Sequence, residues 1–181
     1  MLVEDSERFG GAVVGALQVE EGTGTVLSRG TAINWLGIYS YPIKGANRRS
    51  IDALPGRGML LPVSVVRKIG HIYDRWFPQV YGDIEYSARA KDHGFNLVVS
   101  ERAKVYTSNG SKAWMLGRRG WFKRYFSPYT PTNIPQTLLF CSLRGPRWLR
   151  LWAVPRFVLT IPFRPLLRRS LKSSSLQVRE K

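Results

Sequence analysis

The distribution of charge along the chain most strongly limits what it can fold into. The 181 residues include 28 Lys and Arg against 12 Asp and Glu, a formal net charge of +16. Residues 1–111 hold 13 basic and 11 acidic side chains, whereas residues 112–181 hold 15 basic side chains and a single acidic residue, Glu180. We therefore expect a nearly neutral folded domain, followed by a basic segment that binds an anionic partner.

Length and composition further narrow the class of protein to which the chain can belong. A chain of this length with 44% apolar residues can build one domain with a core, or one domain and a tail. The single cysteine, Cys141, excludes an internal disulfide and a cysteine-based zinc site, and we expect it to fill apolar space. The acidic start of the chain, with Glu4, Asp5 and Glu7, is unlike a signal peptide, so we predict a cytoplasmic location.

The order of helix and strand signals predicts an α/β domain. Residues 2–9 are typical of the end of a helix closed by Gly10 and Gly11, and the apolar run "AVVGALQV" follows as a strand. Residues 25–41 mix strand and loop character. The prolines, glycines and basic residues of 42–58 predict a long irregular loop, and long ordered loops are often functional.

Residues 58–107 carry a more regular pattern. The stretch "GMLLPVSVVRKIG" predicts a strand running into a short helix that begins at Ser64 as N-cap and ends at Gly70. The spacing of residues 83–91 predicts a second helix, closed by Gly94. The segments "FNLVVS" and "AKVYT" then predict two short strands.

The last part of the chain has the composition of a membrane-surface segment. Its stretch "WLRLWAVPRFVLTIPFRPLLRRS" is apolar, but the longest uncharged run, 157–163, is far below the roughly 20 residues that span a bilayer. We therefore expect residues 111–181 to form a basic, amphipathic, partly helical tail that lies on the inner face of the cell membrane. The predicted membrane contacts are Trp121, Trp148, Arg150, Trp152 and Arg156.

Asp83 is the best candidate for a chemical role, because it combines a carboxylate with the start of a predicted helix behind an aromatic loop. The helix dipole favours the ionised form there, and a carboxylate can take the proton of an attacking hydroxyl. An Asp at a helix start also serves as a cap, and the residues alone leave both roles open. Arg89 lies on the same helix, where it would orient a carboxylate or face a phosphate.

Five short elements in order resemble family 2 of the glycosyltransferases, which are inverting enzymes with the A-type nucleotide-sugar fold. The similarity covers about residues 10–107, the acceptor-side half of that fold, and is nearest to the rhamnosyltransferase-like branches. The matching elements are Gly58-Met59-Leu60, Ile69-Gly70 with Asp74 and Phe77, the helix with Asp83, Glu85, Tyr86 and Arg89, then Gly94-Phe95 and Val105-Tyr106.

This resemblance implies a reaction and a set of residues. The sugar of a nucleotide-sugar donor would pass to a polysaccharide, glycolipid or cell-envelope acceptor in one inverting displacement, with Asp83 as the general base. The resemblance assigns acceptor-binding or supporting positions to Gly58, Met59, Asp74, Trp76, Glu85 and Arg89.

The chain departs from the family pattern at two positions of the motif. Gly82 stands where an acidic residue usually precedes the base, and Thr107 stands where a histidine is usual. A divalent metal, Mg or Mn, is expected for the family, but the chain contains no D-x-D motif to hold it. We therefore expect residues 1–110 to be the C-terminal portion of a transferase domain, from a truncated gene, a misplaced start or a split enzyme, and inactive without a nucleotide-binding half.

Other functions stay open at this stage. Basic residues interleaved with aromatics also suit nucleic-acid binding, although the apolar residues of 138–167 are denser than such an arm requires. An inactive transferase remnant is the third possibility. The two histidines, His71 and His93, are expected to be surface or loop residues rather than metal ligands, and Trp76 and Phe77 to belong to the core.

Overall fold

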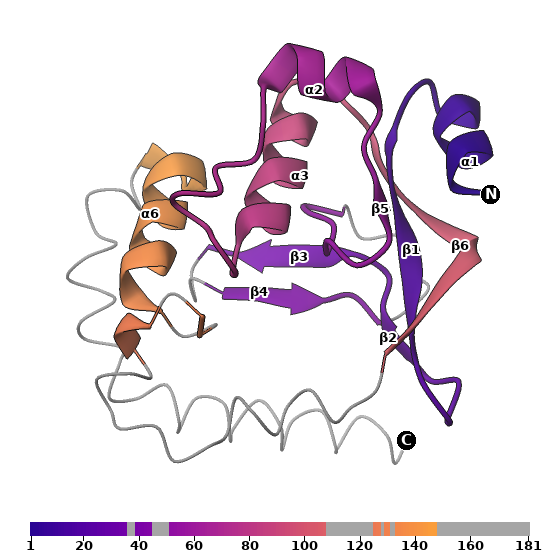
Figure 1. Ribbon diagram of the computed structural model, residues 1–181, viewed down its shortest axis with the longest axis horizontal. Coiled ribbons are helices and arrows are strands. Elements are labelled where there is room, and N and C mark those ends of the chain that lie inside the picture. Colours follow the sequence, from indigo (N-terminus) through magenta and orange to yellow (C-terminus); the bar gives the residue numbers. More distant parts are fainter. Residues whose placement is uncertain (36–38, 45–50, 108–124, 128, 131–132, 148–181) are drawn as a thin grey trace.

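A four-stranded sheet built on β1 organises the protein (Figure 1). The computed structural model describes residues 1–35, 39–44, 51–107, 125–127, 129–130 and 133–147. Strand β6 pairs with β1 in parallel along the whole of β1, so the other edge of β1 is shared by two short antiparallel strands, β5 and β2. The four strands are β1 (Val13–Glu20), β2 (Val26–Ser28), β5 (Met59–Leu60) and β6 (Leu97–Thr107).

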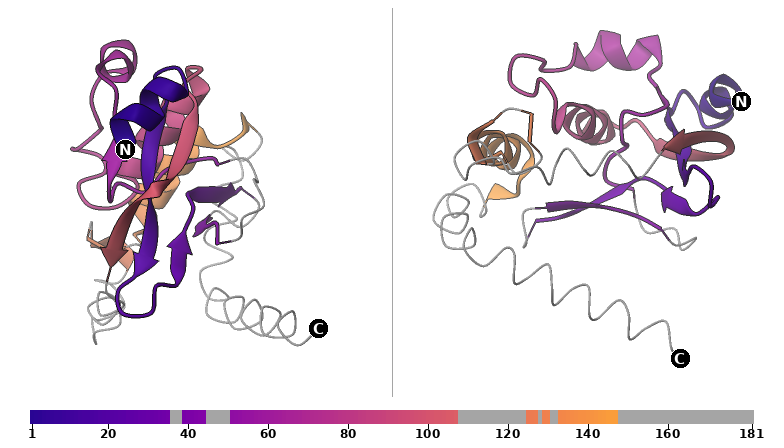
Figure 2. Two further views of the ribbon diagram at one scale, coloured as in Figure 1. Left: turned by 90° about the vertical axis from the view of Figure 1, so that its right-hand side faces the viewer. Right: turned by 60° about the horizontal axis from the view of Figure 1, so that its bottom comes forward.

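A hairpin and four helices complete the described architecture, and the mixture confirms the predicted α/β class. Strands β3 and β4 pair antiparallel, and Thr31 of β3 also bridges to Ala53. The remaining elements are β3 (Thr31–Asn34), β4 (Tyr39–Pro42), α1 (Leu2–Arg8), α2 (Val63–Ile69), α3 (Gly82–Asp92) and α6 (Ile134–Arg144). Figure 2 shows the hairpin as a separate layer beside the main sheet.

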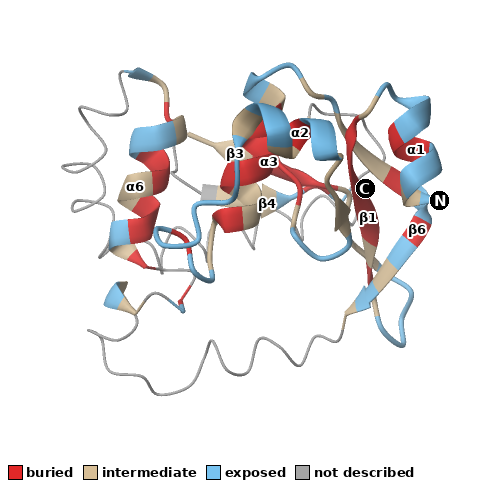
Figure 3. Ribbon diagram, turned by 45° about the horizontal axis from the view of Figure 1, so that its top comes forward, coloured by how far each residue is buried: buried red, intermediate tan, exposed pale blue. Residues whose placement is uncertain are grey.

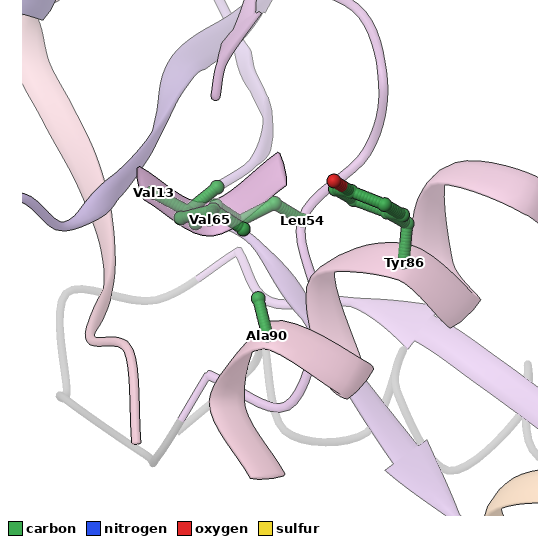
Figure 4. Packing of buried hydrophobic residues seen from close by; sticks show 5 residues of the cluster. All are labelled: Val13, Leu54, Val65, Tyr86 and Ala90. Atoms are coloured by element: carbon green, nitrogen blue, oxygen red, sulfur yellow. The ribbon is translucent and has the colours of Figure 1, made fainter. Parts of the chain in front are cut away.

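The core lies between β1, α2 and α3. Burial is concentrated in β1 and α3 (Figure 3). The first five residues of β1 are all buried, which explains their apolar sequence, since a strand covered on both faces does not alternate. Side chains from four segments meet in the core cluster, which Figure 4 shows. They are Val13, Leu54, Val65, Tyr86 and Ala90.

Strand β6 differs from the sequence prediction. Two short strands were expected from "FNLVVS" and "AKVYT", but one irregular strand covers both. Its register with β1 jumps between Ser100 and Lys104, so three residues bulge out of the ladder. Two of these make ion pairs, Glu101 with Arg29 and Arg102 with both Glu4 and Asp5. The bulge therefore connects the edge of the sheet to α1.

The helix predictions are confirmed, with one correction at an N-terminus. Ser64 is not the cap of α2, because the helix begins at Val63 with Pro62 as N-cap. The fixed φ of proline, −59° at Pro62, suits the entry of a helix without a side-chain hydrogen bond. Gly70 ends α2 with a φ of 75°, which a residue with a side chain rarely adopts. Among the described residues, no helix is long and apolar enough to cross a membrane.

The contact between α1 and the β6 bulge predicts a pH-dependent stability. Hydrogen bonds from Ser100 and Arg102 hold the pKa of Asp5 below its ordinary value of 3.8. A lowered pKa in the folded state stabilises the protein above the unfolded pKa, and this contribution is lost as the pH falls through the folded value. We expect Asp5→Asn to flatten the decrease in the free energy of unfolding below about pH 4.

Urea denaturation followed by circular dichroism at several pH values measures this effect. Glu7→Gln removes an exposed carboxylate of the same helix and is the matched control. Identical acid profiles for the native chain and Asp5→Asn would contradict the role given to Asp5.

Candidate functional site

One face of α3 binds an extended segment, residues 51–56, which we name the strap. Asp83, Ser87 and Lys91 follow one another at intervals of four residues, so they lie on the same face of the helix. Each of the three contacts the strap. The oxygen Asp83 Oδ2 accepts from the amide of Gly56 at 2.5 Å, and Ser87 Oγ accepts from the amide of Leu54 at 2.8 Å.

The third contact is made by Lys91. Its Nζ donates to the carbonyl of Ile51 at 2.7 Å and to the carboxylate of Asp52 at 3.0 Å. Four residues of helix rise about 6 Å, which matches about two residues of extended chain. Successive turns of α3 therefore contact alternate strap residues, 56, 54 and 52.

The carboxylate of Asp83 is held in place by two backbone amides. Besides the Gly56 contact through Oδ2, Oδ1 accepts from the amide of Ile84 at 2.9 Å. The side chain is half-buried in the first turn of α3, where the helix dipole favours a negative charge. Each carboxylate oxygen has two lone pairs, so one on each oxygen is left for a ligand.

The loop after the strap connects Asp83 with the end of β6. Arg57, which is exposed, donates to the hydroxyl of Thr107 at 2.6 Å. Gly58 follows with a φ of 71°, and a Cβ there would meet Val105 at 2.7 Å and Ala16 at 2.9 Å. Only glycine fits this approach. Three elements of the family-like pattern, Gly58, the start of α3 and the end of β6, therefore gather around one loop.

Arg89 holds the loop that follows α2, so its role is structural. It is buried, and its guanidinium donates to the carbonyls of Ile69 at 3.1 Å and His71 at 2.8 Å. Tyr86 donates to the carbonyl between them, Gly70, at 2.8 Å, and burial raises the pKa of Tyr86, which keeps its hydroxyl protonated. Arg89 was expected to orient a carboxylate, and it does lie 3.5 Å from the carboxylate of Glu85. The candidate base, however, is Asp83.

Glu85 is a fully buried carboxylate whose partner is Arg144 of α6. The Nε and Nη2 atoms of Arg144 lie 3.0 and 2.8 Å from Glu85 Oε1, and Nη1 donates to Asp92 at 2.6 Å. One guanidinium thus bridges two turns of α3. This ion pair fixes α6 against α3, so the part of the basic segment formed by α6 packs on the domain.

An aromatic stack lies beside the start of α3. Tyr81, just before the helix, has a φ of 68°, an unusual value for a residue with a side chain. Its ring stacks on Phe140 at 5.0 Å, and Phe140 stacks on Trp35 at 5.8 Å. These rings line a small pocket, together with Ile33, Ser40, Thr137 and Cys141. Cys141 is buried as predicted.

The remaining site predictions divide between core, surface and local turn. Phe77 is buried, as predicted, but Trp76 is 62% exposed, so the prediction that Trp76 belongs to the core is wrong. Asp74 accepts from the amide of Arg75 at 2.8 Å, a local turn contact. Met59 packs against the core cluster from β5.

The described residues do not fit a metal site. Among them, no three His, Cys, Asp or Glu side chains come together as a set of metal ligands. His71 and His93 are exposed, as predicted, and the ring of His93 contacts the carbonyl of Arg89 at 2.8 Å. The predicted membrane contacts, Trp121, Trp148, Arg150, Trp152 and Arg156, lie outside the described residues.

Several residues that build this site had no expected role. Ser87 and Lys91 repeat the position of Asp83 at four-residue intervals, which is a signal visible in the sequence. Gly56 and Arg144 are distant along the chain from their partners on α3, and no local pattern indicates them. Comparison with protein-family models, curated proteins and solved structures found no match.

The strap predicts a specific stability effect of Ser87. Its hydroxyl accepts from Leu54 and donates to the carbonyl of Asp83 at 2.8 Å, so Ser87→Ala leaves a buried amide without a partner. We expect a loss of about 1–3 kcal/mol in the free energy of unfolding, measured by urea denaturation. Ser142→Ala removes an exposed hydroxyl of α6 and should cost less than about 0.5 kcal/mol. Equal losses would contradict the importance of the strap.

The buried ion pair predicts a larger effect. Arg144→Met strips Glu85 of its main partner and should cost about 3 kcal/mol or more, because the buried carboxylate loses both of its hydrogen bonds and keeps only Arg89, 3.5 Å away. The double variant Glu85→Leu with Arg144→Leu should be more stable than Arg144→Met alone. Arg147→Met removes an exposed arginine and is the control. A small cost for Arg144→Met would show that Glu85 does not depend on α6.

Proposed function

We propose that the chain is the acceptor-side part of a family 2 glycosyltransferase, with Asp83 as general base. The observation that carries this proposal is the gathering of Asp83, Gly58 and Thr107 around the loop 55–58. Gly58 and Asp83 belong to separate elements of the family-like pattern, and Thr107 follows the last element, at the position where the family usually has a histidine. Their meeting around one loop supports a shared site.

The chemistry of the proposal requires a carboxylate of fixed direction. An acceptor hydroxyl attacks the sugar carbon while its proton passes to the base, and the bond from that carbon to the diphosphate breaks. The two backbone amides fix the plane of the Asp83 carboxylate, which favours one direction of approach for the hydroxyl. The free lone pairs of its oxygens can accept the proton.

Charge on the leaving diphosphate needs a counter-charge. The described residues do not fit a divalent metal, although the family resemblance implies one, so no step is assigned to a metal here. Arg57 is exposed and directly follows Gly56, the residue of the strap that Asp83 binds. Its guanidinium donates to the hydroxyl of Thr107 on the other side of the loop. We assign Arg57 to the negative charge of the donor, since guanidinium groups suit phosphate oxygens.

Sugar transfer by the full chain, supplied with a family 2 nucleotide-binding polypeptide, tests the proposal. The assay follows radiolabelled sugar from nucleotide-sugar donors into glycan and lipid acceptors of a membrane extract. Asp83→Asn should lower the rate about 100-fold or more, because an amide cannot take the proton. The side-chain oxygen of Asn can still accept from the amide of Gly56, which retains the strap contact, whereas its NH2 group cannot accept from the amide of Ile84.

Ser87→Ala is the matched control, because it disturbs the strap one turn away and leaves the carboxylate unchanged. A much smaller loss of rate is expected for this variant. Equal losses for Ser87→Ala and Asp83→Asn would indicate that Asp83 acts only as a structural contact. Transfer unaffected by Asp83→Asn, or no transfer by the native chain, would contradict the proposed function.

A further inference from the structure

The loop between α2 and α3 presents apolar side chains to solvent from a rigid backbone. Figure 1 shows residues 70–77, which we name the aromatic loop, descending from α2 toward the start of α3. Ile72 and Tyr73 are each 39% exposed and Trp76 is 62% exposed. Single exposed apolar residues are common on protein surfaces, but three within five positions of one loop call for an explanation.

The exposure of these side chains is not a result of missing backbone contacts. Three consecutive carbonyls at the entrance of the aromatic loop, those of residues 69–71, accept hydrogen bonds from Tyr86 and Arg89 of α3. At the other end, the amides of Trp76 and Phe77 donate to the carbonyl of Tyr73 at 3.1 and 2.8 Å. Phe77 is buried and its ring makes an edge contact with the ring of Tyr81, so this end of the aromatic loop is anchored to the interior.

The charges around the aromatic loop are mostly positive. Arg67 in the last turn of α2 and Arg75 within the loop are exposed, against one exposed acid, Asp74, whereas the exposed Lys68 donates to the carbonyl of His93 at 2.9 Å. Tyr73 also lies beneath a cation, with the guanidinium carbon of Arg89 4.1 Å from its ring centroid. An anionic partner is therefore favoured at this surface.

We propose that the aromatic loop docks on an anionic lipid bilayer. A bilayer interface accepts aliphatic, aromatic and cationic side chains together: Ile72 reaches the acyl boundary, Trp76 lies among the headgroups, and Arg75 contacts lipid phosphate. A sugar platform needs an aromatic face but has no use for an exposed isoleucine. The loop leads directly into α3, so docking brings Asp83 close to the membrane surface. That consequence matters only if the proposed function holds, whereas docking itself can be measured without sugar transfer.

Site-specific fluorescence on the full chain tests the docking. The one native cysteine, Cys141, is fully buried, so a thiol-reactive fluorophore labels a cysteine introduced at the surface. Trp76→Cys places the probe on the aromatic loop. Tyr106→Cys places it on β6 at a position of equal exposure, 62%, and is the matched control.

Vesicles of phosphatidylcholine with phosphatidylglycerol should shift the emission of the probe at position 76 to shorter wavelength and protect it from iodide. The probe at 106 should show neither change, and vesicles of phosphatidylcholine alone should have a much smaller effect at 76. In sedimentation, Trp76→Ser should bind the mixed vesicles about tenfold more weakly than the native chain, while Tyr106→Ser should bind like the native chain.

Three results would overturn the inference and leave the proposed function untouched. The first is vesicle binding with no response at position 76, which would place the contact elsewhere in the chain. The second is an equal response at 76 and 106. The third is a response at 76 to RNA or to a purified protein partner but not to anionic vesicles, which would identify another kind of occupant.

Discussion

Helix α3 holds the described part of the protein together, because each of its faces contacts a different segment of the chain. Asp83, Ser87 and Lys91 bind the strap, while Tyr86 and Ala90 enter the core. The third face carries Glu85 and Arg89 toward α6 and the aromatic loop. Five of these seven residues, all but Glu85 and Ala90, contact backbone groups of irregular segments, which have no strand or helix hydrogen bonds of their own. Such segments need side-chain partners if their buried amides and carbonyls are to be satisfied.

The buried charge of Glu85 explains why part of the basic segment belongs to the fold. A carboxylate with no exposed surface is strongly unfavourable unless a cation accompanies it, and Arg144, 59 residues further along the chain, supplies a closer cation than Arg89 of the same helix does. The stacking of Phe140 on Tyr81 adds an apolar contact at the same interface. The charge excess of residues 112–181 is therefore not wholly available to a partner, since at least Arg144 is neutralised within the domain.

Local patterns in the sequence predicted the elements well and the contacts between them poorly. The apolar run of β1, the helices closed by Gly70 and Gly94, and the α/β class all follow from periodicity and from glycine at helix ends. The single bulged β6 did not follow, because the ion pairs of its bulge are made with Arg29 and with α1, about 70 and 100 residues away in the sequence. Trp76 was assigned to the core only because it is aromatic. In the structure Phe77 is the buried anchor of the loop, and the side chain of its neighbour Trp76 faces solvent.

The strap changes how the candidate base should be viewed. An Asp that binds two amides has an adequate structural reason to be where it is, and this reason alone would account for its place at the start of α3. The two roles are nevertheless compatible, because amide contacts use one lone pair of each oxygen and hold the carboxylate plane still. If Asp83 takes a proton, the geometry therefore favours the transfer through the fixed direction of its carboxylate.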